Sequence, residues 1–311
     1  MNTPFFADGS VPLTHWGLIR ARGADALKFL QSQLTNDLLA MPDHSARLAG
    51  FCSAKGRLQA SFIVWKFAPD EVLLACAASV LPATLKRLSM FVMRAQCKLS
   101  DEGGDLNLHG AVGASARGLV ADAGEWGARQ IEGGTLMRLP DVDGTARCML
   151  ALDSRATAPQ QASLSLDTWR WLEVRSGLPL IEAATAEQFV PQMLNYELVG
   201  GVDFQKGCYP GQEVVARSQY RGTIKRRMFL FDCDAPALAG QEVFHSGVAE
   251  QPAGMVVNAA PRPDGTGSAM LVEVKLAALT DGSLHLGAPA GSVLLLGQLP
   301  YPVPIEPVAA A

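Results

Sequence analysis

The stretch from Phe204 to Arg227 reads FQKGCYPGQEVVARSQYRGTIKRR. Within it, Gly207-Cys208-Tyr209-Pro210-Gly211 has glycine and proline at the spacing of a tight turn. Pro210 fixes φ near −65°, Gly211 can adopt a positive φ, and Tyr209 before the proline is restricted to an extended conformation. The chain is therefore expected to reverse direction just after Cys208.

A helix is expected directly after this turn, opening with Gln212 and Glu213, because an acid in the first turn suits the positive end of the helix dipole. Cys208 would then lie near a helix N-terminus, in a turn that contains Gly207 and close in sequence to Lys206. A helix N-terminus and a nearby cation both lower the pKa of a thiol, and only the thiolate is nucleophilic or binds metal. Cys208 is therefore a candidate reactive thiol with Lys206 as its electrostatic support. The alternative is a tight turn around a small buried cysteine.

The run KGCYPGQEVVAR, from Lys206 to Arg217, closely resembles the signature of the YgfZ family. Members of this family are folate-binding relatives of the glycine-cleavage T protein, an aminomethyltransferase, and they support iron–sulfur enzymes. The resemblance covers nearly the whole chain, in the right order. Further matching segments are 24–25 (AD), 29–31 (FLQ), 33–37 (QLTND), 54–57 (AKGR), 177–179 (GLP) and 189–192 (FVPQ).

The resemblance implies an α+β, aminomethyltransferase-like folate-binding fold. Two antiparallel sheet-and-helix subdomains would interleave within residues 1–227, with a division near 102–106, and a small β-barrel domain with a proline-rich tail would occupy residues 228–311. The implied cofactor is tetrahydrofolate or another reduced folate. The implied function is an accessory role in iron–sulfur cluster assembly or repair, with effects on cluster-dependent tRNA modification, and the protein partners would be iron–sulfur enzymes or assembly factors.

Two other functions stay open. One is a folate-dependent one-carbon transferase, and the other is a regulatory protein that binds tRNA directly. The aminomethyltransferases carry an acid in the strand after the hairpin glycine, whereas the corresponding segment here, residues 58–62 (LQASF), has none. Proton transfer at neutral pH needs a titratable group within hydrogen-bond reach. Turnover of the glycine-cleavage type is therefore not expected, although the folate cavity is.

Trp16 and Trp169 resemble family tryptophans that are linked to folate binding, and a flat aromatic ligand needs flat partners. Judged without the resemblance, a tryptophan is usually a core residue. Asn36 belongs to Thr35-Asn36-Asp37, whose side chains favour turns and helix ends. These residues either end a helix or place Asn36 or Asp37 at the mouth of a pocket.

A basic run follows the signature, with five cations and no acid in eleven residues. The cations are Arg217, Arg221, Lys225, Arg226 and Arg227. Such a run is either a solvated face or a site for anions. Among anions, the carboxylates of a folate glutamate tail on Arg217, Arg221 and Arg226 rank above RNA phosphates, because the chain has net charge −4 and no RNA-binding motif.

The composition is that of a globular protein of about two domains, with 311 residues, 49% hydrophobic and 18% charged. The N-terminal sequence lacks a signal-peptide pattern, and no apolar run approaches a membrane span, so we expect a cytoplasmic protein without membrane attachment. The six cysteines have no CxxC spacing, which leaves a local metal site unsupported. Five of them are expected to be buried, reduced thiols.

Hydrophobic periodicity predicts most elements of secondary structure. Strands are expected at 16–22, 47–52, 58–67, 71–77, 94–99, 106–112, 135–139, 147–152, 228–231, 242–244, 254–258, 269–275 and 292–296. Helices are expected at 23–36, 166–176 and from Ser79, as a capping residue, towards Val92. The tail from Pro300 is expected to be extended, and either to pack on the surface or to fray.

Overall fold

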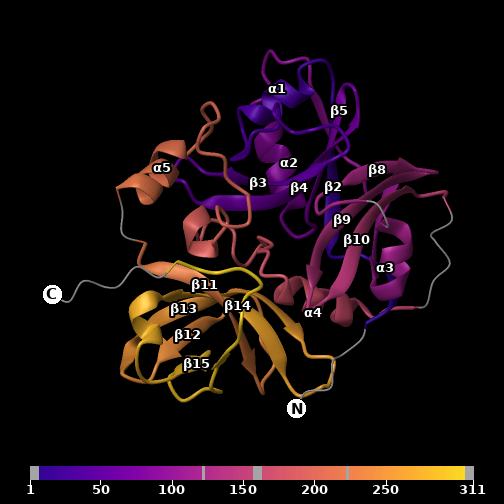
Figure 1. The fold of residues 1–311 in the computed structure, drawn as a ribbon. Coiled ribbons are helices and arrows are strands. Elements are labelled where there is room, and N and C mark those ends of the chain that lie inside the picture. Colours follow the sequence, from indigo (N-terminus) through magenta and orange to yellow (C-terminus); the bar gives the residue numbers. More distant parts are fainter. Residues whose placement is uncertain (1–6, 121–122, 157–162, 222–223, 305–311) are drawn as a thin grey trace.

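The fold is built from three antiparallel sheets arranged around a shared core (Figure 1). It is a computed structural model that describes residues 7–120, 123–156, 163–221 and 224–304. The first sheet has the order β3 (Ala46–Cys52), β4 (Leu58–Ala68), β5 (Glu71–Ala77), β2 (Trp16–Arg22), β6 (Lys98–Asp101). The second has the order β1 (Gly9–Pro12), β7 (Leu106–Val112), β10 (Thr145–Asp153), β9 (Gly134–Val142), β8 (Ala128–Ile131).

The third sheet lies in the C-terminal part of the chain, shown in orange and yellow in Figure 1. Its order is β15 (Leu284–Leu286), β12 (Glu242–His245), β13 (Val248–Pro261), β14 (Ser268–Lys275), β11 (Arg226–Cys233), β16 (Leu295–Leu296). A bridge between His285 and Val293 brings the two ends of this sheet towards each other. The sheet is therefore curled, as expected for the barrel-like C-terminal unit.

Helices cover the outer faces of the first two sheets. The helices are α1 (Ala26–Gln31), α2 (Leu81–Ser89), α3 (Gly113–Val120), α4 (Leu166–Arg175) and α5 (Gln212–Tyr220), with two short 3-10 turns, η1 (Pro191–Leu194) and η2 (Leu276–Leu279). Helices α1 and α2 pack on the first sheet and α3 on the second, whereas α4 contacts β13 and β14 of the third sheet. Helix α4 thus ties the C-terminal unit to the rest of the molecule.

The strands β4, β5 and β10 are nearly continuous hydrophobic runs because they are buried on both faces. In β10, Met149 and Ala151 face the central core, whereas Cys148 and Leu150 face α3. This alternation is the period of two that strand geometry imposes. The central core takes residues from all three sheets and from the segment 178–205 that runs between them. The expected α+β architecture, with two antiparallel sheet-and-helix units and a third sheet at the C-terminal end, is confirmed.

Several local expectations need correction. The helix expected over 23–36 ends at Gln31, because the Gln31 side chain accepts the Leu38 N–H and the chain turns there. Ser79 does not cap α2, since its hydroxyl oxygen accepts the Ala183 N–H. The strand expected over 94–99 lies at Lys98–Asp101.

The start of the proline-rich tail is packed against the protein. Leu299 is buried, and the Tyr301 hydroxyl donates to the Gly177 carbonyl oxygen at 2.7 Å. The expected tail beyond position 304 lies outside the described residues. The part from Pro300 to Pro304 therefore belongs to the folded unit.

Candidate functional site

The signature turn has the predicted backbone. Gly211 has φ 79° and precedes α5, and the Gln212 N–H donates to the Tyr209 carbonyl oxygen at 3.2 Å. The chain reverses after Cys208, and the helix begins at Gln212, as expected. Glu213 lies in the first turn of α5.

Gly211 is required by close packing as well as by its conformation. A Cβ atom at this position would lie 2.3 Å from the Ser53 carbonyl oxygen and 2.7 Å from the Gly56 Cα atom. The signature turn thus lies backbone to backbone on the hairpin turn between β3 and β4. Gly207 has no such requirement, because a Cβ there would meet nothing within 4 Å and its φ is not in the left-handed region. The prediction that Gly207 and Gly211 are the hinges of the turn thus has a steric basis at Gly211, and for Gly207 it stays a prediction.

Cys208 is the one exposed thiol among the six cysteines, all of which lie in the described chain. Cys52, Cys76, Cys148 and Cys233 are buried. Cys97 is half-buried, which corrects the expectation of five buried thiols. Burial raises the pKa of Cys52, Cys76 and Cys148 to about 12 and that of Cys97 to about 11. Any reagent that needs an accessible thiol will therefore meet Cys208 first.

Lys206 is buried and holds the end of α1 against the signature. Its ammonium donates to the carbonyl oxygens of Gln31 and Leu34, the latter at 2.8 Å, and it lies 5.0 Å from the ring centre of Tyr209. Burial lowers the pKa of Lys206 to about 8, although the negative charges of Asp37, Asp203 and Cys208 act in the opposite direction. Lys206 is thus a structural cation within electrostatic range of the thiol. Its support of thiolate formation stays a prediction.

The basic run is largely neutralised by carboxylates that the sequence places elsewhere. Three ion pairs do this: Arg217 with Glu213 at 2.6 Å, Arg226 with Glu273 at 2.8 Å, and Arg227 with the buried Glu197. Arg226 also lines a hollow of about 500 Å³ with Arg57 and Lys275, on the C-terminal sheet. Arg221 is exposed at the end of α5. Arg226 thus lines a hollow that Arg217 and Arg221 do not line, and the binding of a glutamate tail by these three arginines stays a prediction.

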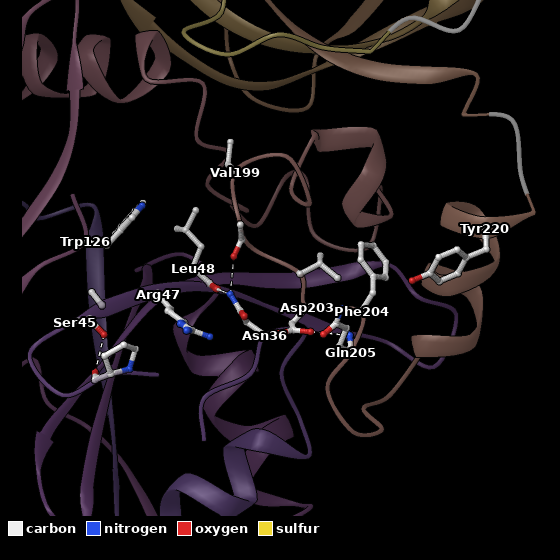
Figure 2. Close-up of a pocket in the computed structure, with 14 residues that line it drawn as sticks. Asn36, Ser45, Arg47, Leu48, Trp126, Val199, Asp203, Phe204, Gln205 and Tyr220 are labelled. Atoms are coloured by element: carbon white, nitrogen blue, oxygen red, sulfur yellow. Dashed lines mark hydrogen bonds between the residues drawn. The ribbon is translucent and has the colours of Figure 1, made fainter. Parts of the chain in front are cut away.

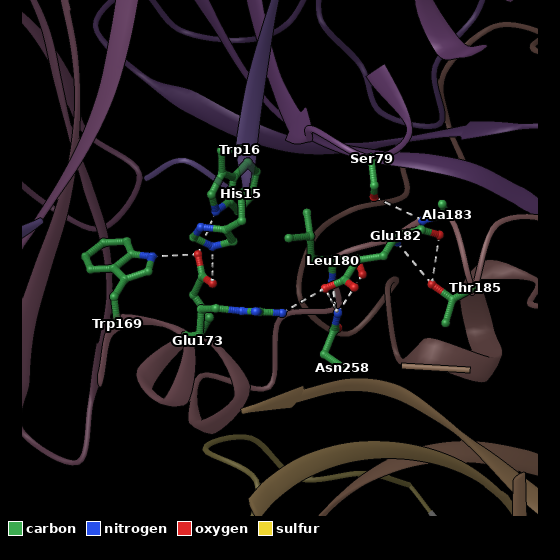
Figure 3. Close-up of polar contacts among 11 residues, drawn as sticks. His15, Trp16, Ser79, Trp169, Glu173, Leu180, Glu182, Ala183, Thr185 and Asn258 are labelled. Atoms are coloured by element: carbon green, nitrogen blue, oxygen red, sulfur yellow. Dashed lines mark hydrogen bonds and ion pairs between the residues drawn. The ribbon is translucent and has the colours of Figure 1, made fainter. Parts of the chain in front are cut away.

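Glu173 on α4 connects the two candidate tryptophans (Figure 3). One carboxylate oxygen, Oε1, accepts the indole N–H groups of Trp16 and Trp169, each at 2.7 Å. The other oxygen, Oε2, lies 2.8 Å from His15 Nε2. Burial acts to raise the pKa of Glu173, but the hydrogen bond and charge of His15 together with the two indole donors outweigh it and lower the pKa overall. Glu173 is thus an anion that fixes both indoles.

The two tryptophans differ in accessibility. Trp169 is fully buried, and its ring lies against Gly110, where a Cβ would come within 2.4 Å of the ring. The guanidinium of the buried Arg147 lies 5.8 Å from the Trp169 ring centre. Trp16 is only half-buried and lines an inner cavity that Arg147 and Glu173 also line. Trp16 thus presents part of its ring to the inner cavity, whereas Trp169 does not line it.

The inner cavity is small as it stands. Its volume is about 40 Å³, room for no more than a few water molecules. Its walls are mostly apolar and come from β3, β4, β9 and residues 178–180. Ser61, from the segment that lacks the aminomethyltransferase acid, lines this cavity, and its hydroxyl oxygen accepts the Ile181 N–H.

A larger hollow of about 690 Å³ lies on the other side of Leu48, which lines both spaces. Figure 2 shows Asn36, Arg47 and Trp126 in its wall, with Phe204 and Tyr220 facing each other at one end. The Asn36 amide nitrogen donates to the carbonyl oxygens of Leu48 at 2.7 Å and Gly200 at 2.6 Å. Asn36 thus lines a pocket, and both of its amide hydrogens are used to hold the wall together.

Glu173, His15 and Arg147 were not singled out from the sequence. Glu173 reads there as an ordinary helix acid, although the four-residue spacing from Trp169 places both on one helix face and was an available signal. Arg147 lies inside a hydrophobic strand, and a charge in such a run is itself unusual. No sequence feature indicates that His15 lies against Glu173.

Glu173→Gln should lower the free energy of unfolding by about 2 kcal/mol at neutral pH, because it removes a partly buried anion that three donors share. The pKa of Glu173 is lower in the folded state than in the unfolded state. At a pH between these two values, the unfolded chain therefore binds more protons than the folded one. The stabilisation is therefore complete above the unfolded pKa and is lost as the pH falls through the folded pKa. Denaturant unfolding at neutral and acid pH measures this effect: the difference in free energy of unfolding between wild type and variant should become smaller as the pH falls. Asp167→Asn, at an exposed acid of the same helix, should leave stability and its pH dependence nearly unchanged; equal effects of both variants would contradict the role of Glu173.

The described residues contain neither a group of three or more potential metal ligands nor a helix long and apolar enough to cross a membrane.

Comparison of the structure with solved proteins defines the class. The aminomethyltransferase T of the glycine cleavage system from Bartonella henselae superposes with a TM-score of 0.73 at 17% identity, over 94% of this chain and 85% of that protein. The protein therefore has the aminomethyltransferase-like fold. No protein-family model matches the chain.

Curated relatives define the family. The tRNA-modifying protein YgfZ of Serratia proteamaculans is 30% identical over 94% of this chain and 92% of its own length. The protein of the same name from Yersinia enterocolitica is 29% identical over 96% of this chain and 97% of its own length. This chain belongs to the YgfZ family.

Proposed function

We propose that this protein is a folate-binding accessory protein that supports iron–sulfur cluster assembly or repair, and thereby the cluster-dependent enzymes that modify tRNA. Two relatives are named tRNA-modifying proteins, which supports a role in tRNA modification for this chain. The single observation that carries the folate part is the half-buried indole of Trp16 in a cavity that also contains Arg147, within an aminomethyltransferase-like fold. The iron–sulfur part is supported by the resemblance to the family and by one exposed thiol, Cys208.

The side chains around the inner cavity have the chemistry to bind a reduced folate, but the cavity is too small to hold one. Trp16 offers an aromatic face, Arg147 offers a cation, and the remaining walls are largely apolar. A bicyclic ring is far larger than a cavity of about 40 Å³, so Leu48 and its neighbours must move for the ring to enter. The adjoining hollow of about 690 Å³ has room for the rest of such a molecule. Binding with a conformational step is therefore part of the proposal.

Titration with a reduced folate should quench tryptophan fluorescence. Trp16→Ala should weaken binding by about 1 kcal/mol or more, because the ligand loses an aromatic partner. Trp169→Ala should weaken binding as well, since it removes one of the two indoles that Glu173 orients. Trp171→Ala is the matched control on the same helix and should bind as wild type does. Unchanged affinity in both Trp16→Ala and Trp169→Ala would exclude this site.

A one-carbon transferase is the weaker candidate. Ser61 stands in the segment where the aminomethyltransferases carry their acid, and its oxygen is already a hydrogen-bond acceptor. Glu173 supplies a carboxylate to the same cavity from another element, but its lowered pKa makes it a poor base at neutral pH. Purified protein with a methylene-folate should accordingly release no formaldehyde above background.

Direct tRNA binding also ranks below folate binding. Three of the five cations in the basic run are paired with carboxylates, and the whole chain carries net charge −4. A surface of this kind offers RNA few unpaired cations. The role in tRNA modification is therefore proposed to be indirect, through cluster-dependent enzymes.

A further inference from the structure

The end of helix α2 exposes apolar side chains that the proposed function does not use. Met90, Phe91 and Met93 are 61%, 37% and 87% exposed. They are three of the ten large hydrophobic side chains that are exposed in the described part of the chain, and they fall within four residues. Single exposed apolar residues are ordinary, whereas a cluster of them is characteristic of an interaction site.

The segment that carries this cluster contains positive charges and no negative ones. Residues 72–100 contain no Asp or Glu, although the chain as a whole has net charge −4. Four exposed cations lie in this range: Lys86, Arg87, Arg94 and Lys98. Within the described chain, none of the four forms an ion pair with a carboxylate. The Arg87 guanidinium lies 4.9 Å from the ring centre of Phe91, which makes cation and aromatic parts of one surface.

Helix geometry extends the surface along α2. Ala83 and Arg87 lie four residues apart in α2, so they share a face that points away from the buried Leu81 and Leu88, and Phe91, in the turn after the helix, lies against Arg87. Ala83 and Arg87 also line a hollow of about 510 Å³ between α2 and the segment 183–188. The exposed apolar cluster thus adjoins a concave space that can accept a side chain.

The composition favours a protein partner. Met, Phe and Arg are enriched in the centres of protein interfaces, and unbranched Met side chains adapt to varied surfaces. A membrane-binding helix buries its own apolar face in the lipid, whereas α2 buries its apolar face, with Leu81 and Leu88, in the protein. A second copy of this chain would place like charges opposite each other in a two-fold contact. The cations therefore complement an acidic partner.

We propose that Arg87, Met90, Phe91, Met93 and Arg94 form a docking surface for a partner protein that presents an apolar side chain flanked by carboxylates. The partner's apolar side chain packs among the methionines and Phe91. Its carboxylates pair with the two arginines. The surface does not depend on folate binding, so its failure and the failure of the proposed function are separable.

The test uses the full chain and two short labelled peptides. In one peptide, leucine and phenylalanine are flanked by pairs of glutamates, and in the other the glutamates are glutamines. The acidic peptide should bind the wild-type protein, and added salt should weaken this binding. The glutamine peptide should bind the wild-type protein at least about 10-fold more weakly than the acidic peptide does. The acidic peptide should lose at least about 10-fold in affinity when Met90→Ser/Met93→Ser or Arg87→Gln/Arg94→Gln replaces the wild-type protein. Fluorescence anisotropy measures each affinity.

The matched control is Leu295→Ser/Leu296→Ser, which removes two apolar side chains of 60% and 59% exposure that lie outside the α2 surface. This variant should bind the acidic peptide within about twofold of wild type. The proposal is overturned if wild type does not bind the acidic peptide, if the glutamine peptide binds equally well, or if the control loses as much affinity as the α2 variants. Binding of phosphatidylglycerol vesicles through the same residues, without peptide binding, would assign the surface to a membrane instead.

Discussion

Replacing Gly211 by alanine should lower the free energy of unfolding by about 3 kcal/mol or more. Two costs add. Placing a side chain in the left-handed conformation costs about 1–2 kcal/mol, and overpacking costs a further ~1–3 kcal/mol. The second cost arises because the new Cβ would lie 2.3 Å from the Ser53 carbonyl oxygen, a backbone atom that cannot rotate away. The turn that carries Cys208 would have to lift from the β3–β4 hairpin.

Gly207→Ala is the matched control. Its Cβ enters open space, and its backbone conformation is accessible to alanine, so stability should stay within about 1 kcal/mol of wild type. Differential scanning calorimetry of both variants measures the effect, with a thermal midpoint several degrees lower for Gly211→Ala alone. Similar midpoints for the two variants would show that the turn does not depend on its contact with Ser53.

The local geometry of the signature was predictable, but its partners were not. Pro210 and Gly211 define a reversal from their own backbone preferences, and the reversal occurs where the sequence places it. The contact of Gly211 with Gly56 joins two turns that are far apart in the chain. Each glycine could be recognised as a turn residue, whereas their mutual packing is a property of the folded molecule.

The same limit applies to charge. Arg226 and Arg227 read as unpaired cations in the sequence, and each finds a carboxylate on a distant segment, Glu273 and Glu197 respectively. Burial raises the pKa of both acids, and the arginines counteract this effect. A count of charges along the chain therefore overestimated the free positive charge of the basic run.

The tryptophans show how a resemblance and a structure complement each other. The resemblance to family residues singled out Trp16 and Trp169, but periodicity could not place both indoles on one carboxylate. Trp16 lies in β2 and Trp169 in α4, and Glu173 joins them. The physical reason for grouping these residues is thus a partly buried acid, Glu173, that local sequence reasoning does not single out.

Cys208→Ala should abolish the ability of the protein to restore iron–sulfur enzyme activity in cells that lack it, while leaving folate affinity within a few-fold. The prediction rests on the proposed function and on the separation of two sites in the structure. Trp16 lines the inner cavity, whereas Cys208 is exposed on the signature turn and does not line that cavity. Folate affinity should therefore depend on Trp16, and activity on the thiol as well.

Thiol chemistry gives an independent measurement. With one equivalent of iodoacetamide at neutral pH, alkylation should occur at Cys208, because burial keeps Cys52, Cys76 and Cys148 protonated and inaccessible. If Lys206 supports the thiolate, Lys206→Ala should slow this reaction. Peptide mass spectrometry locates the modification and gives its rate.

Cys97→Ala is the matched control for the cellular experiment, since it removes a half-buried thiol outside the signature. It should restore enzyme activity as well as wild type does. If Cys208→Ala restored activity equally well, the cysteine would be a passenger in a structural turn, and the requirement for Gly211 would reflect packing alone. If Cys208→Ala lost folate binding together with activity, the thiol and the cavity would be one site, because loss of an exposed side chain has no other route to the ligand.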